Sequence, residues 1–374
     1  MSATVPNSVV AALFGLDDPA AVEVLAVDDV PIHAGDGQGE GVWVVSGFAR
    51  VSGGHRHDFS VVRKRLRRAA GDRSAWDAVD REVDAYASGL LDDLSGIEAP
   101  RLLGVTERPD GAVDLWLERV AEGSDTTQHW GLDRFGLAAR HLGRFGAAGL
   151  AAEAAVAPAH PWLATDWLRR WVEAAGREIH RLAAHAHEPQ VRTAYPPDVL
   201  AVVLDLWEHR QAWLRALDAL PHGLVHQDAF RRNLVDRAGR TVALDWAFVG
   251  PAPVGAEAAP LVVASVAFGE WPLERWRELD HAVREGYLAG LREGGWSGDA
   301  RLAALGYTAS AVLRYPVGTA RLIVPYALGE SDPAVIERVL QVPLAEALRR
   351  WGEVGRIGIE LHAEAERLVG PGPG

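Results

Sequence analysis

The stretch His226-Gln-Asp-Ala-Phe-Arg-Arg-Asn233 runs directly into Leu234-Val-Asp-Arg-Ala-Gly-Arg-Thr-Val-Ala-Leu-Asp245. The second part has two short apolar runs around a turn that contains glycine, which is the pattern of a β-hairpin. Because a hairpin brings its open ends together, the oxygens of Asn233 and Asp245 are predicted to converge. With a further carboxylate at Asp228, such oxygens suit Mg²⁺, which takes few protein ligands and keeps room for phosphates. The stretch therefore predicts a phosphoryl-transfer loop with a metal-binding aspartate shortly after it.

The composition allows an ordinary globular protein of two domains. The chain has 374 residues, of which 48% are hydrophobic and 24% are charged. It contains no cysteine, which excludes disulfides, thiolate zinc sites and cysteine nucleophiles. The net charge of −13 argues against a nucleic-acid partner and is compatible with a cationic substrate. The oligomeric state cannot be inferred from the sequence.

No segment of the sequence predicts a membrane anchor or a secretion signal. The first residues lack the basic and then apolar pattern of a signal peptide. The longest apolar runs, such as Leu261–Phe268, are too short to span a bilayer. We therefore expect a soluble protein of the cytoplasm.

Two residue types are rare enough to be informative. Lys64 is the only lysine, although lysine and arginine together number 38, and asparagine occurs only at Asn7 and Asn233. A compact ammonium differs chemically from the wide planar fork of arginine. The single lysine therefore indicates a position that arginine cannot fill, although chance survival is the alternative.

The first third of the chain predicts a sheet. A short helix is expected over residues 7–14, and strand patterns occur near residues 21–32, 42–51, 59–66, 100–106 and 112–120. Before the second strand, Gly35, Gly37, Gly39 and Gly41 alternate with other residues, a pattern that fits neither a Rossmann loop nor a Walker loop. It fits a glycine loop over phosphates or a plain hairpin turn about equally well.

One helix is predicted within this sheet, over residues 74–91, with Ser74 as its cap. Trp76, Val79, Val83 and Tyr86 recur at helical spacing and form its buried face. Glu82 lies beside that face and is expected to reach the ammonium of Lys64, although an exposed glutamate on a helix is commonplace.

The rest of the chain predicts a mainly helical domain. A small polar connector at residues 121–125 is expected to act as a hinge. Helical patterns then cover residues 132–152, 162–187, 198–220, 272–293, 299–328 and 332–368. The expected domains are residues 1–120 and 121–374, with a disordered tail at about 370–374.

The order of these parts resembles the aminoglycoside phosphotransferase and choline-kinase-like superfamily, which is related to the protein kinases. The resemblance covers roughly residues 20–330 and depends on the glycine loop, Lys64, Glu82, the motif His226-x-Asp228-x4-Asn233 and Leu244-Asp245-Trp246. It implies an α+β, bilobal, protein-kinase-like fold. The small N-terminal lobe would contain an antiparallel sheet and a helix. The larger C-terminal lobe would be mainly helical, with a catalytic β-hairpin.

The resemblance also implies roles for individual residues. Asp228 would orient the acceptor hydroxyl or accept its proton, and His226 would brace the loop. Asn233 and Asp245 would hold Mg²⁺ on the phosphates of ATP or GTP. The nucleotide would further contact the following residues: Lys64, fixed by Glu82; the loop glycines Gly37, Gly39 and Gly41; and, at its adenine, the backbone near Glu118 and Val120. Many members of the superfamily have glycine where this chain has Gln227.

The implied reaction is transfer of the γ-phosphate to a hydroxyl of a small molecule. The acceptor would be an aminoglycoside-like antibiotic, or a sugar, an amino alcohol or another metabolite. Glu257, Glu270 and Asp166 are candidates to select a cationic acceptor by position alone, with a surface role as the alternative for each. Arg231 and Arg232 would touch phosphate or face solvent. A nucleotide-binding pseudokinase is the rival from another class, whereas a zinc hydrolase is disfavoured because no helix carries H-E-x-x-H.

Overall fold

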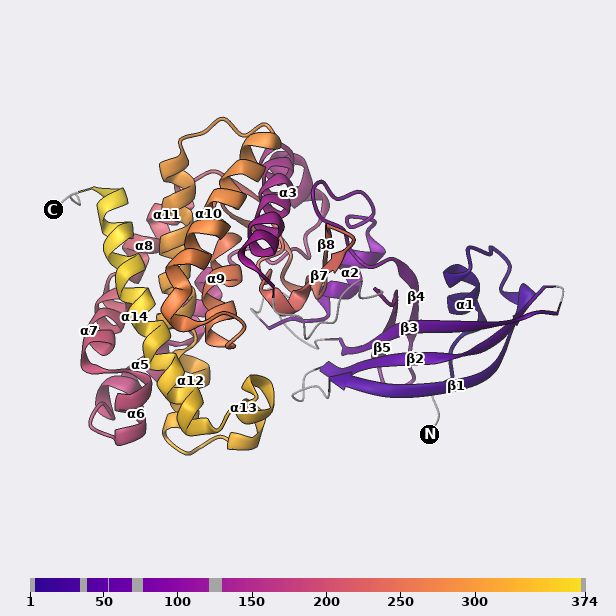
Figure 1. Ribbon diagram of the computed structural model, residues 1–374, viewed down its shortest axis with the longest axis horizontal. Helices are drawn as coiled ribbons and strands as arrows, with labels where there is room; N and C mark the ends of the chain where they lie inside the picture. The colour runs from indigo at the N-terminus through magenta and orange to yellow at the C-terminus, as the bar shows by residue number, and fades with distance from the viewer. Residues whose placement is uncertain (1–3, 34–38, 53, 69–76, 121–129, 371–374) are drawn as a thin grey trace. The chain divides into compact units, whose positions relative to one another are not determined.

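The computed structural model describes residues 4–33, 39–52, 54–68, 77–120 and 130–370 (Figure 1). The chain forms two compact units. Unit 1 contains residues 1–94, 98–123 and 235–247, and unit 2 contains residues 95–97, 124–234 and 248–374. Unit 1 therefore includes the hairpin segment in addition to the sheet predicted before residue 120. The predicted tail (residues 371–374) and the predicted hinge (residues 121–125) lie outside the described residues.

A five-stranded antiparallel sheet forms the centre of unit 1, in the order β1-β2-β3-β5-β4 (Figure 1). Its strands are β1 (Val22–His33), β2 (Gly39–Val51), β3 (Arg56–Arg67), β4 (Leu102–Glu107) and β5 (Ala112–Glu118). Helix α1 (Asn7–Leu13) and the short η1 (Pro19–Ala21) precede the sheet, and α2 (Arg81–Ala87) follows β3. The five predicted strands and the helix between the third and fourth strands are thus confirmed.

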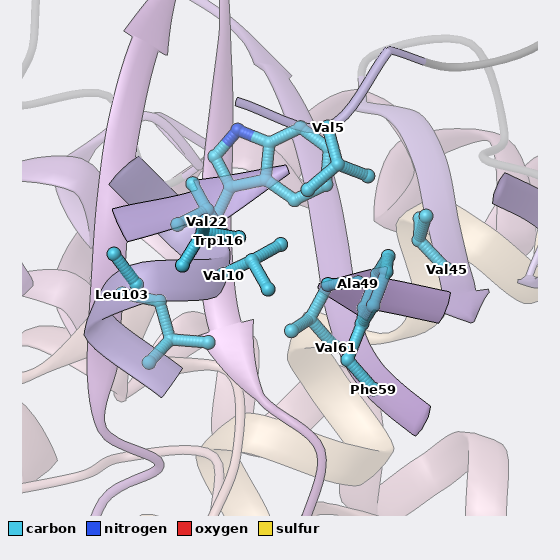
Figure 2. Close-up of a cluster of buried hydrophobic side chains, with 11 residues drawn as sticks. Val5, Val10, Val22, Val45, Ala49, Phe59, Val61, Leu103 and Trp116 are labelled. Atoms are coloured by element: carbon cyan, nitrogen blue, oxygen red, sulfur yellow. The ribbon is translucent and has the colours of Figure 1, made fainter. Parts of the chain in front are cut away.

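Successive residues of a strand point to opposite sides of the sheet. The sheet therefore has two faces, and each face packs against a different helix. On one face, Phe59 and Val61 of β3 are buried in a cluster with Val10 of α1 (Figure 2). On the other face, Leu66 of β3 packs against Val83 of α2. Lys64 is two residues from Leu66, so strand alternation turns it to the face that α2 covers.

Helix α2 is shorter than the sequence pattern predicts. It begins at Arg81, whereas residues 77–80 form turns, and the proposed cap at Ser74 lies outside the described residues. The helix ends at Ala87, not at Leu91. Gly89 follows with a φ of +75°, the left-handed conformation that commonly ends a helix.

The predicted hairpin is present and belongs to unit 1. β7 (Leu234–Arg237) and β8 (Arg240–Ala243) form a two-stranded sheet. Ala238 and Gly239 have φ values of +52° and +83°, which is the conformation of a two-residue type I′ turn. The carboxylate of Asp236 accepts a 2.8 Å hydrogen bond from the N–H of Gly239 and steadies this turn.

Unit 2 is mainly helical, as predicted. Its α-helices are α3 (Leu132–Ala159), α4 (Trp167–Ala174), α5 (Gly176–Ala184), α6 (Pro189–Ala194), α7 (Pro197–Glu208), α8 (Arg210–Asp218), α9 (Ala258–Ala267), α10 (Trp276–Glu293), α11 (Ala300–Val312), α12 (Ala320–Ala327), α13 (Pro333–Leu340) and α14 (Leu344–Val369). Two strands, β6 (His222–Val225) and β9 (Gly250–Pro253), pair antiparallel. Its remaining short elements are η2 (Arg231–Asn233), η4 (Leu273–Arg275) and the π-helical η5 (Leu313–Gly318). The short η3 (Trp246–Phe248) follows the hairpin, with Trp246 and Ala247 in unit 1 and Phe248 in unit 2.

Several predicted helices are wrong in extent. Residues 299–328 are not one helix, because Pro316 interrupts the hydrogen-bond ladder and the chain forms the π-turn η5. Residues 332–368 break at Gln341, whose φ is +57°, just before Pro343. The pairing of β6 with β9 and the helix α9 were not predicted. Every residue of α9 is buried, so its sequence is apolar on all sides and has no amphipathic period.

Helices α3 and α10 pack side by side (Figure 1) through glycines that bring their backbones close together. A side chain on Gly290 would overlap the carbonyl oxygen of Arg140, and one on Gly143 would overlap that of Tyr287. Backbone lies against backbone here, so neither neighbour has a flexible side chain that could move aside. None of the helices in the described part of the chain combines the length and hydropathy that a membrane span requires.

We predict that Gly290→Ala lowers the free energy of unfolding by about 1–3 kcal/mol, the usual effect of overpacking, although alanine is the better helix former. Gly131→Ala is the control, because a methyl group at Gly131 meets nothing within 4 Å. Urea unfolding of both variants measures the difference. A Gly290→Ala protein as stable as the control would contradict the close packing of α3 and α10.

Candidate active site

Lys64 lies at the centre of a charged cluster within unit 1. It belongs to β3, where it pairs with Val42 of β2 and Leu115 of β5. Its ammonium forms an ion pair with Glu82 of α2 and a 2.8 Å hydrogen bond with Oδ1 of Asp245. Burial alone would lower the pKa of Lys64, but the carboxylates of Asp245 and Glu82 outweigh it and raise the pKa. Lys64 is therefore a fixed positive charge.

Glu82 fixes more than the lysine. Its side chain is 1% exposed, and its Oε1 accepts a 3.2 Å hydrogen bond from the N–H of Trp246. The neighbouring Arg81 donates from Nε to the carbonyl oxygen of Ala247 at 3.0 Å. Helix α2 thus holds both Lys64 and the segment that follows β8. The contact of Glu82 with Lys64 was predicted, and the structure adds Asp245 to it.

A second cluster forms within unit 2, on the loop that follows β6. Asn233 donates from Nδ2 to Oδ2 of Asp228 at 3.1 Å and to its carbonyl oxygen at 3.0 Å. The N–H of Asp228 donates to Nδ1 of His226 at 3.2 Å, and His226 is fully buried. The loop therefore holds the carboxylate of Asp228 from its own residues, and His226 lies where it can brace the loop.

Gln227 occupies the position where many members of the superfamily have glycine. Its φ is +66°, a left-handed conformation that favours glycine. Its side chain is 6% exposed and donates from Nε2 to the carbonyl oxygen of Ala164 at 3.1 Å. This buried hydrogen bond offsets the backbone strain, so a glutamine is compatible with the loop conformation.

Glu257 forms a hydrogen bond with the main chain of the same loop. Its Oε2 accepts a 3.0 Å hydrogen bond from the N–H of Gln227, and the side chain is 1% exposed. Burial raises the pKa of Glu257 to about 8, although the N–H of Gln227 and the charge of Arg314 lower it. Glu257 is thus a buried structural acid, and not a group that selects an acceptor.

Two other acceptor candidates have surface or structural roles. Glu270 forms a 2.7 Å ion pair with Arg232, whose Nη1 also donates to the carbonyl oxygen of Val339. Asp166 is exposed and precedes α4 with a φ of +56°. Arg231 is buried, with its guanidinium carbon 4.9 Å from the ring centroid of Trp130. The alternative in which Arg231 faces solvent is therefore wrong, whereas Arg232 is exposed, as that alternative predicts.

The other residues predicted to bind nucleotide are only partly described. Gly37 lies outside the described residues, while Gly39 and Gly41 lie on β2 at an irregularity in its pairing with β3. Glu118 ends β5, and its carboxylate accepts a 2.6 Å hydrogen bond from Arg237 of β7. Val120 follows the strand and is half-buried. These contacts fix the end of β5 to the hairpin within unit 1.

The two predicted metal ligands, Asn233 in unit 2 and Asp245 in unit 1, each have an oxygen of the type that Mg²⁺ prefers. The amide nitrogen of Asn233 is used by Asp228, so the amide oxygen is the atom left for a metal. The side chain of Asp245 is 42% exposed and presents a carboxylate. Among the described residues, no group of three or more His, Asp or Glu side chains could hold a metal alone. Each of these two oxygens, taken within its own unit, is of the kind that Mg²⁺ binds.

Arg314 is the residue that sequence reasoning missed. It lies in η5, and its Nη2 donates to Oδ1 of Asp228 at 2.6 Å. Its Nη1 donates to the carbonyl oxygen of Gln227. The available signal was Pro316 inside a helical pattern, which marks an irregular turn but does not say what the turn carries.

Solved structures of small-molecule kinases share this fold. An aminoglycoside phosphotransferase from Alicyclobacillus acidocaldarius matches with a TM-score of 0.53 at 15% identity, over 98% of each chain. A choline kinase from Cryptosporidium parvum matches with a TM-score of 0.54 at 10% identity, over 96% of each chain. An amicoumacin kinase in complex with AMP-PNP and Ca²⁺ matches with a TM-score of 0.52 at 16% identity, over 91% of this chain and 89% of its own.

These likenesses show the fold: the chain has the α+β, protein-kinase-like fold of the aminoglycoside phosphotransferases and choline kinases. The predicted fold class and the predicted resemblance are confirmed at this level. No family model and no curated protein sequence matches the chain.

We predict that Glu257→Gln removes a pH dependence of stability. The pKa of Glu257 is raised in the folded state, so its contribution to stability is complete below its ordinary value of 4.5 and is lost as the pH rises through about 8. The loss should be on the order of 2–5 kcal/mol. Urea unfolding of the wild type at both ends of this interval should therefore show a slope that the variant lacks.

Glu208→Gln, at an exposed position of α7, is the control for this experiment and should keep the slope of the wild type. If Glu257→Gln has the same slope as Glu208→Gln, Glu257 is not a buried acid in the folded protein.

Proposed function

We propose that the protein is a Mg²⁺-dependent phosphotransferase that moves the γ-phosphate of ATP or GTP to a hydroxyl of a small molecule. The observation that carries this proposal is the cluster of Lys64, Glu82 and Asp245. A buried ammonium between two carboxylates is costly to desolvate, and charged groups of this kind are concentrated at functional sites. It supplies the charges that a phosphate chain and its metal need.

The division of roles follows from the chemistry of each side chain. Lys64, oriented by Glu82, would donate hydrogen bonds to the nucleotide phosphates. Asn233 and Asp245 would hold Mg²⁺, which neutralises developing charge when bound. Asp228 would accept a hydrogen bond from the acceptor hydroxyl and orient it for in-line attack. Phosphoryl transfer needs little covalent help, so positioning and charge neutralisation carry most of the rate.

The acceptor is the least determined part of this proposal. Proteins of this fold include kinases named for an aminoglycoside, for choline and for amicoumacin, so the fold does not select one acceptor. An aminoglycoside-like antibiotic is our first candidate, and a sugar, an amino alcohol or another metabolite is the alternative. Because Arg314 forms an ion pair with Asp228, that carboxylate by itself gives little support to a strongly cationic acceptor.

We predict that Asp228→Asn lowers kcat by about 10²–10⁴-fold, the usual scale for losing a general base. The measurement is Mg²⁺-dependent ADP or GDP release on a panel of hydroxyl-bearing acceptors, with nucleotide binding followed by thermal stabilisation. Asp218→Asn, which alters an exposed ion pair with Arg169, is the control and should keep full activity.

Three outcomes of this experiment separate the hypotheses. Activity of Asp228→Asn near the wild-type level would refute the role of Asp228. Stabilisation of the wild type by nucleotide, with no turnover on any acceptor, would favour the pseudokinase. Neither stabilisation nor turnover would refute both.

We further predict that Lys64→Arg raises the KM for nucleotide by about 10–10²-fold, the equivalent of one charge-assisted hydrogen bond. The wider guanidinium does not fit between Glu82 and Asp245 as the ammonium does. Arg67→Lys, a conservative exchange on the same strand, is the control. Unchanged nucleotide kinetics in Lys64→Arg would refute the inference from the single lysine.

A further inference from the structure

One guanidinium ties the side chain and the main chain of the catalytic loop together. Arg314 donates from Nη2 to Oδ1 of Asp228 at 2.6 Å and from Nη1 to the carbonyl oxygen of Gln227. The exposed fractions of the Arg314 and Asp228 side chains are only 12% and 17%. The pair is thus largely removed from water, where an ion pair with good hydrogen bonds is strongest.

The π-turn η5 holds Arg314 at this place. Pro316 lacks the N–H that a regular helix would use, and the turn widens here. The indole Nε1 of Trp171 donates to the carbonyl oxygen of Arg314 at 2.9 Å, which fixes the main chain. The guanidinium carbon lies 4.6 Å from the ring centroid of Trp167, which fixes the side chain.

The indoles of Trp167 and Trp171 pack against each other as a stacked pair. They are stacked, with centroids 5.4 Å apart and an interplanar angle of 13°. A glycine is needed at position 318 for this stacked pair, because a side chain there would overlap the indole of Trp171. The position of Arg314 is therefore determined by packing on two sides and does not depend on Asp228 alone.

The carboxylate of Asp228 is held by two donors, one on each oxygen. Arg314 donates to Oδ1 and Asn233 donates to Oδ2 at 3.1 Å. A carboxylate with one donor can turn about its own bond, whereas one with a donor on each oxygen has a fixed plane. A carboxylate oxygen can accept more than one hydrogen bond, so a donor on it does not by itself exclude a hydroxyl.

We propose that Arg314 is a positioning residue for phosphoryl transfer: it fixes the plane of the Asp228 carboxylate against the acceptor hydroxyl. This inference rests on the proposed function. A lysine could not replace it, because a single ammonium does not reach the loop carbonyl and the carboxylate with the fixed geometry of a fork. Arg314 touches neither nucleotide nor acceptor in this role and acts through Asp228.

The first test compares Arg314→Lys and Arg314→Ala with the wild type. Both variants should lower kcat by about 10–10²-fold, the scale for misplacing a catalytic group by about 1 Å, while the KM for nucleotide changes little. Guanidinium ions at millimolar concentration, far below denaturing levels, should restore part of the activity of Arg314→Ala and leave the wild type unchanged. Arg169→Ala, which breaks an exposed ion pair on α4, is the matched control.

The second test is a double-mutant cycle of Arg314→Ala with Asp228→Asn, followed under single-turnover conditions. If Arg314 acts through Asp228, its removal should cost far less in the Asp228→Asn background than in the wild type. A merely structural role of Arg314 would give the same loss in both backgrounds, without guanidinium rescue.

The outcomes separate this inference from the function on which it rests. Full kcat in Arg314→Ala, or equal losses in the two backgrounds, would overturn the proposed role of Arg314. The proposed phosphotransferase function would still hold in that case if the wild type is active. A wild type without turnover on any acceptor would overturn both.

Discussion

A buried ammonium needs carboxylates, and this requirement organises unit 1. Lys64 lies on a central strand of the sheet, on the face that α2 covers, and its charge is matched by Glu82 and Asp245. Removing either partner would leave a desolvated charge, which is strongly destabilising. Strand β3, helix α2 and the segment after β8 must therefore come together even though Lys64 and Asp245 are 181 residues apart in the chain. The same requirement brings the lysine, the helix glutamate and the candidate metal ligand into one cluster.

In unit 2, side chains from several parts of the chain hold the irregular loop after β6 in one conformation. The loop after β6 has no regular hydrogen-bond ladder, so its groups find partners elsewhere. Glu257 accepts from the N–H of Gln227, and the side chain of Gln227 donates to Ala164. Arg314 and Asn233 hold the two oxygens of Asp228. Asn233 belongs to the loop itself, and the other three partners come from separate stretches of unit 2. Packing of unit 2 and the geometry of the loop therefore depend on each other.

The candidate site shows how far single-sequence reasoning reaches. A hairpin turn is local, and the turn at Gly239 has the form expected from the sequence. Lys64 was a further signal, because a residue type that occurs only once can be recognised from the composition without any knowledge of the fold. Arg314 gave no such signal: it is one of many arginines, and the π-turn that presents it arises from Pro316 and from two tryptophans that lie far away in the sequence. Likewise, the fully apolar α9 has no period that separates a helix from a buried strand.

The sequence by itself determined the five strands of the sheet, the helix between the third and fourth strands, the hairpin and the residue types suited to phosphate and Mg²⁺. These features follow from periodicity, turn chemistry and short motifs, all of which act over a few residues. Only the tertiary structure decided which arginine meets Asp228, that Glu257 is a buried acid beneath the loop, and that Gln227 adopts a left-handed conformation. Each of these depends on which distant groups supply a hydrogen bond or exclude water at one point, and that is a property of packing and not of local sequence.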